Sequence, residues 1–209
     1  VAEGGLSEEL INSRVRDILR VKFLVGLFDA PYQTDLAGAD TEVEKEEHEA
    51  VALQASRESI VLLKNEDQTL PLSLDKVKTI AVCGPNADEE SYALTHYGPL
   101  AVDVTTVLEG IKNKVAGKAE VLYTKGCDLV DANWPDSELI DFPLTEKEQA
   151  DINQAVENAR RADVCVVVLG GGQRTCGENK SRSSLELPGR QLDLLKAVQA
   201  TGKPVVLVL

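Results

Sequence analysis

The sequence predicts an α/β protein in which a mainly parallel sheet is sandwiched between helices, in three α/β/α layers. Segments typical of strands and of helices alternate from residue 41 to residue 209. Residues 164–169 read Val-Cys-Val-Val-Val-Leu and are apolar at every position, as expected of a strand buried on both faces. In such sheets ligands meet the loops at the carboxyl ends of the strands, here 84–87 and 170–184.

A helix is predicted ahead of this alternating part. Ser7 is a suitable N-cap, and Glu8 and Glu9 follow in the first turn, where carboxylates complement the helix dipole. Apolar residues then recur at helical spacing, at Leu10, Ile11, Val15, Ile18 and Leu19. Gly26 follows the last turn, and a linker through Asp40 leads to the next element.

The alternating part is predicted to open with a helix whose capping box is Thr41 and Glu44. The apolar run 60–63 either ends this helix or begins a strand. The sequence then predicts four strands, at 79–83, 119–123, 164–169 and 205–209.

Three helices are predicted to connect these strands. The capping boxes Thr106/Glu109 and Thr145/Glu148 mark the starts of the first two, and Pro188 is placed to begin the third.

Charge and cysteine spacing exclude several classes of function. The net charge of −13, from 35 acidic and 22 basic residues, argues against nucleic acid or a membrane surface as a partner, because both are anionic. No apolar run reaches the ~18 residues of a membrane span, and residues 1–5 carry no signal-peptide features. The four cysteines form no C-x-x-C pair and lie far from the histidines, so neither a metal site nor a cofactor is predicted. Whether Cys127 and Cys176 pair is left open.

The glycine-rich loop after residue 169 does not fit a nucleotide site. Gly172 and Gly177 have the spacing of a P-loop, but Glu178 stands where that loop needs a lysine, and a carboxylate repels phosphate. The dinucleotide pattern fails as well, because Thr175 replaces its third glycine.

Glu178 is the remaining candidate for chemistry in this loop. Arg174, Lys180 and Arg182 flank it, and Gly177 permits backbone angles that aim a side chain into a cleft. From spacing alone, a solvated surface glutamate is the favoured interpretation.

Motifs along nearly the whole chain resemble those of family 3 glycoside hydrolases. Residues 15–32 resemble the closing helix of that family's catalytic barrel, and residues 55–72 resemble the start of its second domain. The agreement continues in the segments 80–87, 106–111, 123–127 and 187–191. The resemblance implies that residues 1–30 are the last helix of a (β/α)8-type barrel, 31–44 a linker, and 45–209 an α/β sandwich domain truncated at its C-terminus.

The resemblance also implies an activity for the parent protein, with the sugar bound between the two domains. That activity is retaining, exo-acting removal of terminal non-reducing β-D-glucosyl residues from β-linked oligosaccharides or from aryl and alkyl β-glucosides. Glu178 matches the family's general acid/base, and the nucleophilic aspartate of the barrel is absent from the chain, so the isolated chain is expected to be inactive. Glu186 is the nearest rival, although its place at a helix start suggests a structural role.

Three alternatives stay open, namely a β-xylosidase, an exo-glucanase, or a non-catalytic carbohydrate-binding or structural domain. Arg174 and Arg182 are candidates for binding sugar hydroxyls or for holding Glu178 ionised, and otherwise are solvated cations. The acidic segment 128–141 lacks a calcium-loop pattern and is interpreted as a solvated insertion. Its Trp134 either stacks on a sugar or anchors the segment. The resemblance favours a periplasmic or extracellular location.

Overall fold

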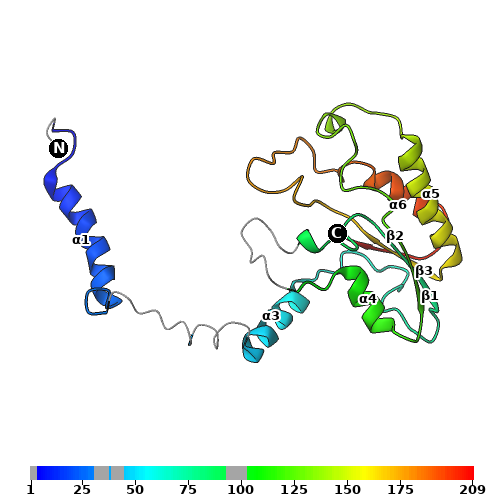
Figure 1. The fold of residues 1–209 in the computed structure, drawn as a ribbon, viewed down its shortest axis with the longest axis horizontal. Coiled ribbons are helices and arrows are strands. Elements are labelled where there is room, and N and C mark those ends of the chain that lie inside the picture. The colour runs from blue at the N-terminus through cyan, green and yellow to red at the C-terminus, as the bar shows by residue number, and fades with distance from the viewer. Residues whose placement is uncertain (1–3, 31–37, 39–44, 93–102) are drawn as a thin grey trace. The chain divides into compact units, whose positions relative to one another are not determined.

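A computed structural model of the protein describes residues 4–30, 38, 45–92 and 103–209 (Figure 1). The chain divides into two compact units, 1–63 and 64–209.

The helices of the first unit whose bounds the structure describes are α1 (Glu8–Leu24) and α3 (Glu46–Ser59). Helix α1 begins at its predicted N-cap, where the Ser7 Oγ accepts a hydrogen bond from the Leu10 N–H at 3.1 Å. Neither helix has a buried residue. The predicted capping box at 41 and 44 lies outside the described residues.

The second unit is built on a four-stranded parallel sheet with the order β2-β1-β3-β4 (Figure 1). All four predicted strands are confirmed to within one residue at each end. Their bounds are β1 (Thr79–Cys83), β2 (Glu120–Thr124), β3 (Val164–Val168) and β4 (Val205–Val208). Every residue of β3 is buried, as its continuous apolar sequence predicted.

Helices cover both faces of the sheet, which confirms the three-layer α/β/α prediction. Because successive strand residues point to opposite faces, the strands divide their side chains between two cores. Helix α4 (Val107–Val115) supplies Leu108 to the core that contains Ile80, Val82, Val164 and Val166. Helices α5 (Glu146–Arg161) and α6 (Gln191–Gln199) supply Ile152, Ala155, Leu194 and Val198 to the other, with Ala81, Cys165 and Val167. Two short 3₁₀ helices, η1 (Glu90–Tyr92) and η2 (Asp136–Glu138), lie in the connections.

Two local predictions need correction. Helix α6 begins at Gln191, three residues after Pro188, because Gly189 adopts a φ of +59°, which a right-handed helix does not contain. The run 60–63 joins neither a helix nor a strand. Helix α3 ends at Ser59, its C-cap Ile60 is extended, and Ile60 to Leu63 are exposed.

The topology places a switch point at the middle of the sheet. The chain leaves β1 through α4 towards β2 on one side, whereas it leaves β3 through α6 towards β4 on the other. The loops that follow β1 and β3 therefore diverge and leave space between them at the carboxyl edge of the sheet.

Candidate active site

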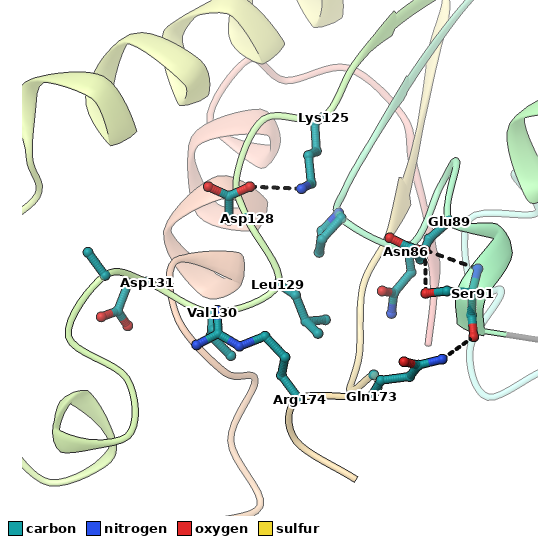
Figure 2. A pocket seen from close by; sticks show the side chains of 13 residues that line it. Asn86, Glu89, Ser91, Lys125, Asp128, Leu129, Val130, Asp131, Gln173 and Arg174 are labelled. Carbon is teal, nitrogen blue, oxygen red and sulfur yellow. Dashed lines mark hydrogen bonds and ion pairs between the residues drawn. The ribbon is translucent and has the colours of Figure 1, made fainter. Parts of the chain in front are cut away.

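A hollow of about 430 Å³ occupies this carboxyl edge (Figure 2). Its walls come from the loops that follow β1, β2 and β3, so it lies where the topology predicts a ligand site. The lining residues are Pro85, Asn86, Glu89, Ser91, Lys125, Asp128, Leu129, Val130, Asp131, Ala132, Gly172, Gln173 and Arg174.

Hydrogen bonds tie the three loops together around the hollow. The Asn86 Nδ2 donates to the Gly171 carbonyl at 3.0 Å. The Gln173 Nε2 donates to the Ser91 carbonyl at 2.6 Å (Figure 2). The Gly84 N–H donates to the Lys125 carbonyl at 2.9 Å. Because each bond joins loops that follow different strands, the shape of the hollow depends on the sheet as a whole.

Charges of both signs line the hollow. Lys125 Nζ lies 2.7 Å from Asp128 Oδ1, and this hydrogen bond lowers the pKa of the Asp128 carboxyl below its usual value (Figure 2). Arg174 supplies a second cation, and Glu89 and Asp131 supply two further carboxylates. Interspersed donors and acceptors of this kind suit a neutral polyhydroxylated ligand better than a phosphate or a polyanion.

Gln191 fastens the start of the candidate loop. It is fully buried, and its side-chain oxygen accepts from the Gly170 N–H at 2.8 Å. Its Nε2 donates to the carbonyls of Leu129 and Gly170, both at 2.9 Å. Sequence reasoning missed this residue. The only signal was a glutamine in the first turn of a helix whose other buried positions, Leu194 and Val198, are apolar.

Glu178 lies on the loop after β3, as predicted, in the exposed stretch 176–181. Gly177 has a φ of +121° and Asn179 a φ of +62°, so the backbone on both sides of Glu178 adopts angles that L side chains rarely take. Arg174 lines the hollow, whereas Glu178 is not among its lining residues. The structure thus separates these two candidates along one loop.

Arg182 is held by the acidic segment. Its Nε donates to Glu138 Oε1 at 2.6 Å, one Nη donates to the Glu186 carbonyl at 2.7 Å, and the guanidinium lies 5.5 Å from the ring centroid of Trp134. The contact of Trp134 with Arg182 agrees with its interpretation as an anchor of the segment. A sugar-binding role for Arg182 stays a prediction.

The acidic segment 128–141 is attached to the domain rather than solvated throughout. Val130 and Asp131 are buried, and the Glu138 side chain is only 9% exposed. The expectation of a solvated insertion was wrong because acidic composition says nothing of partners elsewhere in the chain. Arg182 and Gln191 provide those partners.

The cysteines differ in burial. Cys127 is buried and Cys176 exposed, and all four cysteines are free thiols. Burial raises the pKa of both Cys83 and Cys127 to about 12, so neither is a nucleophile near neutral pH.

Within the described ranges, no group of three His, Cys, Asp or Glu residues is placed to hold a metal ion. None of the helices described has the length and apolar character needed to cross a bilayer.

Comparison with known proteins shows that the chain is similar to members of one protein family. Residues 60–209 match the model of the glycosyl hydrolase family 3 C-terminal domain. The chain is 37% identical over 100% of its length to a periplasmic beta-glucosidase of Salmonella typhimurium, of which it covers 28%. It is 37% identical over 95% of its length to a beta-xylosidase of Formosa agariphila, of which it covers 26%.

Solved structures agree with these matches. A beta-glucosidase involved in saponin metabolism from intestinal bacteria superposes with a TM-score of 0.81 at 34% identity, over 99% of this chain and 30% of that one. A mutant beta-glucosidase from Listeria innocua, solved with laminaribiose, superposes with a TM-score of 0.77 at 29% identity, over 99% and 26%. The chain therefore spans less than a third of the length of these relatives.

Proposed function

We propose, from the premise that this chain belongs to glycoside hydrolase family 3, that the protein containing it is a retaining, exo-acting β-glycosidase. Its substrates would be β-linked oligosaccharides and aryl or alkyl β-glucosides, cleaved at the terminal non-reducing β-D-glucosyl residue. The family match over 60–209 is the observation that carries the proposal. The mixed-charge hollow at the carboxyl edge of the sheet supports a neutral, hydroxyl-rich substrate.

Glu178 is the proposed general acid/base. Retaining hydrolysis needs two carboxyl groups about 5–5.5 Å apart, of which one attacks the anomeric carbon and the other protonates the leaving oxygen and later activates water. The position of Glu178, on the loop after β3 at the carboxyl edge, supports the second role. The nucleophile would be an aspartate of a barrel domain outside these 209 residues.

The proposed domain organisation follows from the same family. Residues 1–30 would be the last helix of the barrel, 31–44 a linker, and 45–209 the sandwich domain. Arg174, at the hollow, would bind hydroxyls of the substrate. The periplasmic relative from Salmonella typhimurium supports a location in the periplasm or outside the cell.

The test of Glu178 is the kinetics of Glu178→Ala in the whole enzyme. Loss of acid–base catalysis lowers kcat on an aryl β-glucoside by about 10²–10⁴-fold. Azide should restore turnover and yield a β-glycosyl azide, because a small anion needs no general base. Glu186→Ala is the matched control, since Glu186 is an exposed glutamate eight residues further along the same loop. Unchanged activity in Glu178→Ala would assign the proton to another group.

The 209-residue chain alone is expected to be inactive, because it would supply one carboxyl group of the two. The measurement is hydrolysis of an aryl β-glucoside by the purified chain at high concentration. Turnover that co-purifies with the chain and disappears in Glu178→Ala would contradict this.

A β-xylosidase is the second candidate, favoured by the 37% identity to the enzyme of Formosa agariphila. The ratio of kcat/KM for aryl β-glucoside and aryl β-xyloside in the whole enzyme decides between the two sugars.

A further inference from the structure

We propose that Glu138 is a positioning residue for Glu178, because it fastens the segment just after Glu178 to the acidic segment that follows β2. This inference rests on the proposed function of Glu178. It gives a role in the reaction to a segment that carries none of the predicted catalytic residues.

The contacts of the Glu138 carboxylate are all with residues four and five positions beyond Glu178. Oε1 accepts from the Arg182 Nε at 2.6 Å. Oε2 accepts from the Ser183 N–H at 3.0 Å and from the Ser183 hydroxyl at 2.9 Å. Both oxygens are therefore occupied by one short stretch of the candidate loop.

The surroundings of this pair strengthen it. The side chains of Glu138 and Arg182 are 9% and 20% exposed, so water screens their attraction less than that of a surface pair. Trp134 lies against the Arg182 guanidinium. The hydrogen bonds from Ser183 and Arg182 lower the pKa of Glu138, which keeps it ionised at neutral pH.

The other end of the loop has a matching fastening. Gln191 binds the N–H and carbonyl of Gly170 and the carbonyl of Leu129. The segment after β2 is thus joined to the loop at two points. Gln191 links Leu129 of this segment to Gly170 of the loop. Glu138 of the segment binds Arg182 and Ser183. Glu178 lies between these two ties, so releasing one of them lets the carboxyl group move away from its reactive position.

The first experiment asks whether the tie exists, and it uses the 209-residue chain, in which Trp134 is the only tryptophan. In Glu138→Gln the amide oxygen still accepts, but the amide nitrogen only donates, so the side chain can no longer accept from Arg182 on one atom and from Ser183 on the other. We therefore expect Arg182 to be released from Trp134. We expect red-shifted Trp134 emission and stronger acrylamide quenching. Glu157→Gln is the matched control, because it removes an exposed ion pair with Arg160 far from Trp134 in the sequence. Identical spectra for wild type and Glu138→Gln would overturn the proposal.

The second experiment asks whether the tie positions the acid, and it uses the whole enzyme. Protonation of the leaving group matters for an alkyl β-glucoside and hardly at all for a dinitrophenyl β-glucoside. Glu138→Gln should lower kcat/KM for the alkyl substrate by roughly ten- to a hundredfold, the cost of a small misplacement, and leave the dinitrophenyl substrate nearly unchanged. Ser183→Ala removes one of the three bonds and should give a smaller effect of the same kind.

Glu178→Gln, measured in parallel, separates the two hypotheses. Suppose that Glu178→Gln lowers kcat/KM for the alkyl substrate much more than for the dinitrophenyl substrate, while Glu138→Gln lowers neither. In that case the positioning role is wrong and the acid/base assignment stands. If Glu178→Gln lowers kcat/KM equally for both substrates, the acid/base assignment fails and the positioning role fails with it. A Glu138→Gln variant that loses both activities in proportion to a lower Tm would identify a purely structural role.

Discussion

Gly84, the residue directly after β1, lies against the backbone of β3. Its φ is +113°, and a Cβ placed on it would come within 2.0 Å of the Val168 carbonyl oxygen. Only glycine satisfies both conditions. Since Asn86 two residues later is bonded to Gly171, this close approach sets one wall of the hollow.

We predict that Gly84→Ala destabilises the chain by roughly 2–5 kcal/mol, because overpacking and an unfavourable φ act together. The measurement is urea denaturation followed by circular dichroism. Gly110→Ala is the control, since Gly110 lies within α4 and its nearest neighbour, a Thr105 methyl, is 3.9 Å from an added Cβ. That change should stabilise the chain by about 0.5–1 kcal/mol. Equal effects of the two substitutions would contradict the crowding at Gly84.

At the scale of single helices, both predicted capping boxes that lie within the described residues are formed. In α4, Thr106 Oγ1 accepts from the Glu109 N–H at 3.2 Å, while the Glu109 carboxylate accepts from the Thr106 N–H at 3.0 Å. In α5, Thr145 and Glu148 make the same exchange. Local sequence was sufficient here because the two residues of each box lie only three positions apart.

The box of α5 has a partner that its local sequence did not show. Arg190, at the N-cap of α6, lies 3.3 Å from Glu148 and donates to the carbonyls of Phe142 and Pro143 at 2.8 and 3.0 Å. Burial acts to raise the pKa of Glu148, but hydrogen bonds from Thr145 and Arg190 outweigh it, and the pKa lies below its ordinary value of 4.5.

We predict that Glu148→Gln lowers the free energy of unfolding by roughly 1 kcal/mol at pH 7. A carboxyl whose folded pKa is depressed contributes stability that is present above its unfolded pKa and lost as pH falls through the folded pKa. The difference between wild type and variant should therefore shrink below about pH 4.5. Urea denaturation at pH 7 and pH 3.5 measures it, with Glu146→Gln as the control in the same helical turn. A difference that does not change with pH would exclude the ionised box as its source.

On the scale of the whole molecule, the two units differ in how far their apolar residues are buried. The second unit buries them in two cores, one on each face of the sheet. Helix α1 has no buried residue, and Ile18, Phe23 and Leu24 are 62%, 65% and 79% exposed. Exposed apolar side chains gathered on one helix are typical of a surface that packs against another domain. This supports the proposal that α1 closes a barrel in the longer protein.

The sequence alone determined the layers and the strand positions of this protein. Apolar periodicity, capping boxes and turn residues are local signals, because each reports on neighbours within one or two turns of chain. Glu178 became a candidate through motif order along the chain, and its assignment as the acid/base is still a proposal. Arg174 was likewise visible as a cation in the loop, although its place at the hollow was not.

Only the tertiary structure decided which segments meet at the carboxyl edge. The contacts Gln191–Gly170, Glu138–Arg182 and Asn86–Gly171 join residues 21, 44 and 85 positions apart. No local pattern encodes such pairs, because they arise from the order in which four parallel strands assemble. For the same reason Pro188 gave a wrong helix start. Gly189 has a left-handed φ of +59°, and a Cβ placed on it would come within 2.8 Å of the backbone at Val130 and Asp131, more than fifty residues earlier in the chain.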